Sequence, residues 1–132
     1  MKTLNVIMLI AFMAFASTGI AQQNNAEVLF FKAELSCCKA RACEQLEKDI
    51  KSIVEENFSD NELVFRSVKL ADNENKALVD KYNAKNQSVV VVTDKSGEEK
   101  FIDISDLVAR YQKNQNKESV KNEIVKKIKT IL

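Results

Sequence analysis

The sequence predicts an α/β domain in which helices flank a mixed four-stranded sheet, in the order β-α-β-α-β-β-α. Two observations lead to this fold class. From Val28 onward an apolar run, an amphipathic helix and an alternating segment follow one another, which implies two parallel strands joined by a right-handed crossover. Later, a run of four valines precedes a turn and a second short strand, which indicates a hairpin and therefore antiparallel pairing.

The first three elements follow from apolar spacing. Val28 to Phe31 is a short apolar run and is expected to be a buried strand. A helix is expected from about Lys39 to Asn57, because apolar side chains recur there at intervals near 3.6 residues. These positions are Ala42, Leu46, Ile50, Ile53, Val54 and Phe58. The segment Leu63 to Leu70 alternates between apolar and charged residues and is expected to be the next strand.

The second half of the chain continues the alternation. Residues 74–82 are expected to form a short helix, and residues 88–93, with their valines, a strand buried on both faces. A Lys-Ser-Gly-Glu turn leads into a return strand at residues 100–104. Helices are expected over residues 105–112 and 117–132. The lysines of the last helix are expected to form a solvated face, because apolar residues line its opposite side.

The N-terminal residues have the layout of a cleaved secretory signal. Lys2 supplies the basic start, Val6 to Phe15 the apolar core, and small residues end at Ala21. The apolar core is shorter than the about 20 residues of a transmembrane helix. We therefore expect a signal peptide at residues 1–21, a spacer at 22–26, a domain at 27–132, and a periplasmic or secreted protein.

Charge excludes some partners. Removal of residues 1–21 takes away Lys2 and no acidic residue, which leaves 19 basic and 19 acidic residues. Neither nucleic acid nor an anionic membrane would attract such a chain electrostatically. We expect no nucleic-acid partner and no membrane insertion after cleavage.

The residue types that remain point to thiol chemistry. The chain has no histidine, so imidazole-dependent mechanisms and histidine metal sites are excluded. It has three cysteines, and one disulfide in an oxidising compartment would leave a thiol over. That odd number predicts a mixed disulfide, a reactive thiol or a soft-metal site.

Two segments resemble the thioredoxin superfamily. The strand Val28 to Phe31 leads through Lys32-Ala33-Glu34 into cysteines at the expected start of a helix. The stretch Tyr82 to Val89 is similar to the one that precedes the third core strand of thioredoxins. The resemblance covers residues 27–132 and is closer still to the secreted ArsF-type thioredoxin-like proteins, which are described as a nitroreductase subunit. It implies a thioredoxin-like fold and a redox role.

The sequence also departs from the thioredoxin pattern. It lacks Cys-x-x-Cys: in an ungapped match Cys37 falls on the attacking thiol, Ala40 on the resolving one, and Cys43 lies one helical turn further on. Phe30 takes the place of the buried strand carboxylate. Ser88 takes the place of the cis-proline, where it either opens room beside the thiols or simply starts a strand.

The candidate catalytic residues are Cys37, Cys38 and Cys43. Cys37 or Cys38 is the expected nucleophile, because unpaired N–H groups and the positive end of the dipole at a helix start favour a thiolate. Lys39 and Arg41 add positive charge in the same sense. Cys43 is the expected buried partner and resolving thiol. The expected partners are protein thiols or disulfides of a redox partner, which could be a membrane protein.

Helix geometry restricts the disulfides. If residues 38–43 are helical, Cys38 and Cys43 lie about 7.5 Å apart along the axis. A disulfide needs Cα atoms no more than about 6.8 Å apart. A bridge from Cys37 or Cys38 to Cys43 therefore requires an irregular first turn, and a Cys37–Cys38 bridge would be strained and easily reduced.

Two alternatives to redox exchange remain open. No cofactor is required, but Cys37, Cys38 and Cys43 together would suit a soft metal or metalloid, namely Cu(I), trivalent arsenic (As(III)) or zinc. Zinc would need a fourth ligand, from Glu44, Glu47, water or a partner. The other alternative is a subunit that has kept the thioredoxin fold without redox activity.

Overall fold

The computed structural model describes residues 25–36 and 38–132, so the predicted signal peptide and Cys37 lie outside the described residues. The expected order of elements is confirmed. The elements are β1 (Asn25–Lys32), α1 (Cys38–Asn57), β2 (Val64–Lys69), the 3-10 helix η1 (Asn73–Asn75), α2 (Lys76–Tyr82), β3 (Val89–Lys95), β4 (Glu98–Asp103), α3 (Ser105–Lys113) and α4 (Lys117–Lys129).

The four strands form one mixed sheet in the order β2-β1-β3-β4, which confirms the predicted fold class. β1 pairs in parallel with β2, with Val28 opposite Phe65. On its other side β1 pairs antiparallel with β3, and β3 with β4. The two apolar runs of the sequence are therefore the two central strands.

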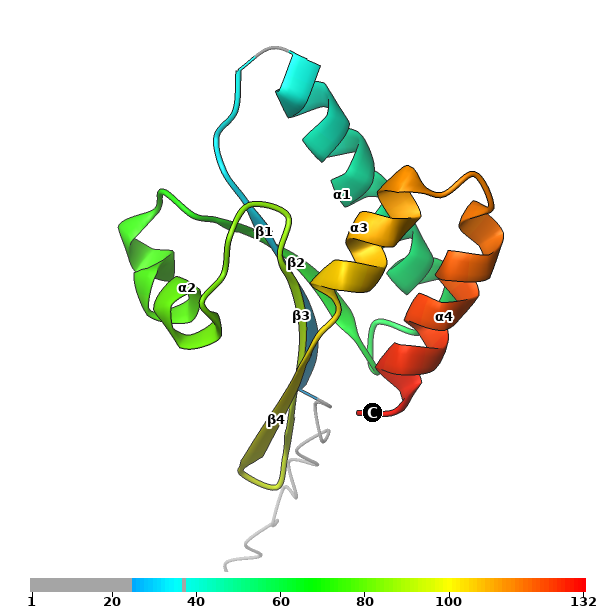
Figure 1. Ribbon diagram of the computed structural model, residues 1–132. Coiled ribbons are helices and arrows are strands. Elements are labelled where there is room, and N and C mark those ends of the chain that lie inside the picture. Colours follow the sequence, from blue (N-terminus) through cyan, green and yellow to red (C-terminus); the bar gives the residue numbers. More distant parts are fainter. Residues whose placement is uncertain (1–24, 37) are drawn as a thin grey trace, which may run out of the picture.

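Helices cover both faces of this sheet (Figure 1). α1, α3 and α4 lie on one side, over a core that includes Val28 and Phe30 of β1. α2 lies on the other side, over a smaller core that includes Leu29 and Phe31. Successive residues of a strand point to opposite faces, so a central strand covered twice must be apolar throughout.

The apolar residues of β2 and its flanks divide between these two faces. Leu63 and Phe65 pack in the larger core, whereas Val68 and Leu70 pack in the smaller one. The pairs lie at odd and even positions, as a strand with period 2 requires. The apolar residues therefore switch from one face of the sheet to the other in the middle of the strand.

The N-terminal boundary of the sheet differs from the prediction. β1 begins at Asn25, so the last two residues of the predicted spacer belong to the strand. Ala26 pairs with Thr93 of β3 and is buried. The polar residues on either side of Ala26 hide this extension in the sequence. Ala26 is buried only because β1 pairs there with β3.

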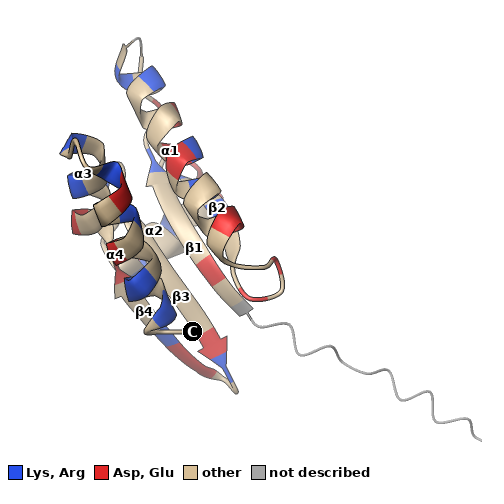
Figure 2. Cartoon of the chain, turned by 90° about the vertical axis from the view of Figure 1, so that its right-hand side faces the viewer, with Lys and Arg blue, Asp and Glu red and all other residues tan. Residues whose placement is uncertain are grey.

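Four of the five lysines of α4 are exposed, as expected, whereas Lys121 is half-buried, and Lys117 and Lys121 pair with α1. Lys117 Nζ lies 3.5 Å from Asp49 Oδ2, and Lys121 Nζ lies 2.8 Å from Glu56 Oε2. Basic and acidic side chains are interspersed along the helices (Figure 2). In the described part of the chain, no helix combines the length and apolar character needed to cross a membrane.

Candidate functional site

The described thiols lie where β1 passes into α1. Cys38 is the first residue of α1 and is exposed to solvent. Cys43 lies in the second turn of the same helix and is only 4 % exposed. Both are free thiols. The structure thus places Cys38 at a helix start and Cys43 in the core, as the spacing predicted.

The regular helix keeps these two thiols apart. From Cys38 to Cys43 the helix rises by about 7.5 Å and turns by about 140°, since each turn takes 3.6 residues. The separation exceeds the about 6.8 Å that a disulfide allows between Cα atoms. With α1 intact, Cys43 does not reach Cys38, and a resolving role for Cys43 would require the first turn to unwind.

A cavity of about 360 Å³ lies beside Cys43, at the C-terminal ends of β1 and β2. Its lining residues are Lys32, Ala33, Glu34, Leu35, Ala40, Cys43, Glu44 and Lys69. Two ion pairs border it: Lys32 Nζ lies 2.8 Å from Glu47 Oε2, and Lys69 Nζ lies 3.8 Å from Glu34 Oε1. The charges around the cavity are largely compensated.

Burial raises the pKa of the Cys43 thiol. A hydrogen bond from the Gln87 side chain opposes this shift, as does the nearby charge of Lys32. The carboxylates of Glu47 and Glu44 raise the pKa further. Cys43 is therefore a neutral thiol at pH 7, which suits a buried group and not an attacking one.

The turn between α2 and β3 closes the site. Asn86 Oδ1 accepts hydrogen bonds from the backbone N–H of Ala33 at 2.9 Å and from Cys43 Sγ at 3.9 Å. The hydroxyl of Ser88 accepts from the N–H of Lys85 within the turn. The described polar contacts from this turn to Cys43 thus come from Asn86 and Gln87, and not from Ser88.

Sequence reasoning did not single out Asn86 and Gln87, although both lie in the stretch that resembles thioredoxins. Gln87 has φ of +67°, a conformation uncommon for a residue with a side chain. The Asn-Gln pair just before a valine run was the available signal for a turn, because asparagine favours such turns.

The remaining candidates are placed as follows. Lys39 and Arg41 are exposed on the first turn of α1. Phe30 is fully buried, with its ring centroid 6.2 Å from that of Phe65. Among the described residues no three cysteine or carboxylate side chains lie close enough to hold a metal ion. The three-thiol site includes Cys37 and stays a prediction.

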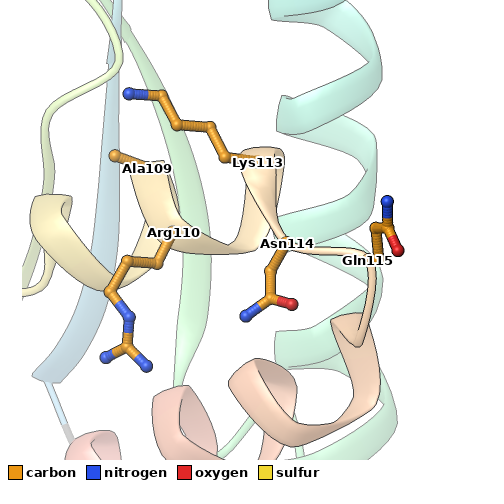
Figure 3. A pocket seen from close by; sticks show the side chains of 5 residues that line it. All are labelled: Ala109, Arg110, Lys113, Asn114 and Gln115. Carbon is orange, nitrogen blue, oxygen red and sulfur yellow. The ribbon is translucent and has the colours of Figure 1, made fainter.

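A second cavity, of about 500 Å³, lies at the junction of α3 and α4. Its lining residues are Ala109, Arg110, Lys113, Asn114 and Gln115. In Figure 3 the polar side chains point in different directions, and Arg110 is engaged by Glu123 at 2.9 Å. This cavity offers no convergent set of groups for chemistry.

Comparisons with known proteins do not assign the chain to a family. No protein-family model matches the chain, and no curated protein matches it. A solved thioredoxin from Thermus thermophilus is similar in structure, with 18% sequence identity, a TM-score of 0.41 and 58% of each chain covered. The chain thus spans 58% of the length of that thioredoxin. The fold class itself rests on the sheet order β2-β1-β3-β4 and on the helices that cover both faces.

Proposed function

We propose that this protein exchanges disulfides outside the cytoplasm, with Cys38 as the attacking thiol. The observation that carries the proposal is the contrast between the two described thiols of α1. Cys38 is exposed at the first residue of a 20-residue helix, whereas Cys43 is buried and uncharged. A protein disulfide can reach the first thiol and not the second.

The surroundings of Cys38 support nucleophilic attack. Unpaired N–H groups at the start of a helix stabilise a thiolate, and α1 carries no acidic residue in its first turn. Lys39 and Arg41 lie in that turn and are exposed. The charged side chains in the first turn of α1 are therefore all basic.

The proposed exchange proceeds through a mixed disulfide. The Cys38 thiolate attacks one sulfur of a partner protein's disulfide, that S–S bond breaks, and the other partner sulfur leaves as a thiolate and takes a proton. A small thiol then attacks Cys38 Sγ, which releases the partner sulfur as a thiol. A second small thiol regenerates Cys38, so two small thiols become one disulfide as the partner is reduced.

A set of variants on a Cys37→Ser background tests the role of Cys38. A chromogenic aromatic disulfide is added to folded protein, and release of the coloured thiolate is followed with time. We expect the Cys38→Ser variant to react at least about tenfold more slowly at pH 7, since only the buried thiol remains.

The matched control is Cys43→Ser on the same background, which should keep the parental rate within about twofold, because the exposed thiol is untouched. Equal and slow reaction of both variants would contradict the proposal and favour the redox-inactive subunit. Tight binding of As(III) or Cu(I) by the chain with all three cysteines, lost when any one of them is replaced by serine, would instead favour the metal-binding alternative.

Export is part of the proposal and rests on the pattern of residues 1–21. We expect the exported protein to begin at or near Gln22, because the small residues ending at Ala21 suit the cleaving peptidase. Intact-mass measurement on protein from the periplasm or medium checks this. Recovery of the full-length chain in the membrane fraction would contradict it.

A further inference from the structure

We propose that Asn86 is a positioning residue that holds Cys43 as a buried, protonated thiol, so that exchange passes through Cys38 alone. The consequence for exchange rests on the proposed function, whereas the effect on Cys43 can be measured without it. The inference starts from one oxygen atom of Asn86, which contacts the loop after β1 and helix α1, 53 and 43 residues away in the sequence.

Asn86 Oδ1 is this shared acceptor. It accepts from the N–H of Ala33, in the loop after β1, at 2.9 Å. It also accepts from Cys43 Sγ, on α1, at 3.9 Å. The side chain therefore connects the turn before β3 to the loop after β1 and to α1, the helix that carries the thiol.

The backbone of β1 fixes the position of this turn. The N–H of Gln87 donates to the carbonyl of Phe31 at 2.8 Å, and the N–H of Phe31 donates to the carbonyl of Ser88 at 2.8 Å. These bonds over-determine the turn and hold Gln87 at its positive φ. The hydrogen bonds to the buried central strand β1 thus fix the position from which Asn86 contacts Cys43.

An acceptor beside a thiol favours its protonated form, because the S–H group then has a partner that the thiolate cannot use. Gln87 acts in the opposite sense and stabilises the thiolate. The charged groups that face Cys43 are Glu44 and Glu47 of α1 and Lys32 of β1, and the cavity adds Glu34 and Lys69. Lys32 pairs with Glu47 and Lys69 with Glu34, so burial, the carboxylate of Glu44 and the acceptor Asn86 act together to keep the proton on Cys43.

The bond to Ala33 also restricts access to Cys43. Ala33 and Leu35 line the cavity beside the thiol, and both belong to the loop that Asn86 holds. Loss of this bond would free the loop from the turn. A small reagent would then reach Cys43 through the cavity more easily.

The test uses protein in which Cys43 is the single thiol, made with Cys37→Ser and Cys38→Ser. Alkylation by iodoacetamide is followed against pH for the parent with Asn86 and for its Asn86→Ala and Asn86→Asp variants. We expect Asn86→Ala to react about tenfold faster at pH 8, because the loop and the S–H acceptor are both released. Asn86→Asp keeps an acceptor but adds a negative charge, so it should react about tenfold more slowly, with its pH profile moved up by about one unit.

The opposite directions separate this role from a merely structural one, which would make both variants faster. Asn122→Asp, at an exposed site on α4, is the charge control and should leave the profile unchanged. If Asn86→Ala proves unfolded by circular dichroism, the Asn86→Asp variant, which is nearly the same shape, still decides. An Asn86→Asp profile that equals the parental one, or a faster reaction of that variant, would overturn the inference.

This result does not depend on exchange, because Cys38 is absent from every protein in the series. A slow Cys38 in the aromatic-disulfide assay, together with the expected Asn86 profiles, would refute the proposed function alone. A fast Cys38 with unresponsive Asn86 variants would refute the positioning role alone.

Discussion

The Phe30→Asp variant is expected to lose more than about 4 kcal/mol of its free energy of unfolding at pH 7. Phe30 lies in central strand β1, opposite Ser67 of β2 and Val89 of β3, and is 0 % exposed. A carboxylate there would lie in an apolar core with no cationic partner among the described core residues. Because natural domains are stable by only about 5–15 kcal/mol, this loss removes a large share of the stability and should lower the urea concentration at the midpoint of unfolding.

The loss should depend on pH with a definite sign. Burial would raise the folded-state pKa of the introduced carboxyl above its unfolded value of about 3.9. The destabilising effect of the charge is then smallest below that value and grows as pH rises through it. Urea unfolding at several pH values, followed by circular dichroism, measures this dependence.

Phe30→Leu is the matched control, because it keeps an apolar side chain and should cost less than about 1.5 kcal/mol. Its stability should not share the pH dependence. Equal losses for the two variants at pH 7 would mean that water or a charged side chain reaches position 30, contrary to the packing described.

Cys38 and Cys43 are expected not to form a disulfide while α1 is folded. On a Cys37→Ser background, treatment with diamide under native conditions should leave no intrachain bridge, because the regular helix separates the two residues by more than a disulfide allows. The same treatment in concentrated urea should give the bridge. Loss of two mass units, read by mass spectrometry after digestion, distinguishes the two states.

The denatured sample serves as the positive control for the oxidant. Rapid bridging under native conditions would contradict the expectation and show that the first turn of α1 unwinds readily. It would also restore Cys43 as the resolving thiol that the sequence suggested: Cys43 would then release the partner, and small thiols would be needed only to reduce the resulting Cys38–Cys43 disulfide.

Much of the fold could be predicted because it depends on local periodicity. Leu46, Ile50 and Ile53 recur at helical spacing and are all buried on α1. The run of valines in β3 was enough to predict a buried strand, because valine is enriched in strands. The placement of Cys38 and Cys43 followed from the same helical period. Where burial is set by spacing along one element, one sequence is sufficient.

The contacts that define the site could not be predicted in this way. Asn86 lies 43 residues from Cys43, and only the docking of the turn against β1 brings them together. A single polar residue in a turn belongs to no periodic pattern, so the sequence does not indicate which distant residue it contacts. The beginning of β1 was missed for a related reason, since Ala26 is buried by Thr93 of another strand.

The unequal cover of the two sheet faces affects how the molecule fluctuates. α2 has seven residues, none of them fully buried, whereas α1 and α4 each contribute several buried side chains to the larger core. Local opening costs least where least apolar surface is buried, so we expect α2, over the smaller core, to open more often than α1 or α4 over the larger one. The turn that carries Asn86 follows α2 directly, and each such excursion would loosen its hold on Cys43. Amide protons in α2 and residues 83–88 should therefore exchange with solvent through the same opening event.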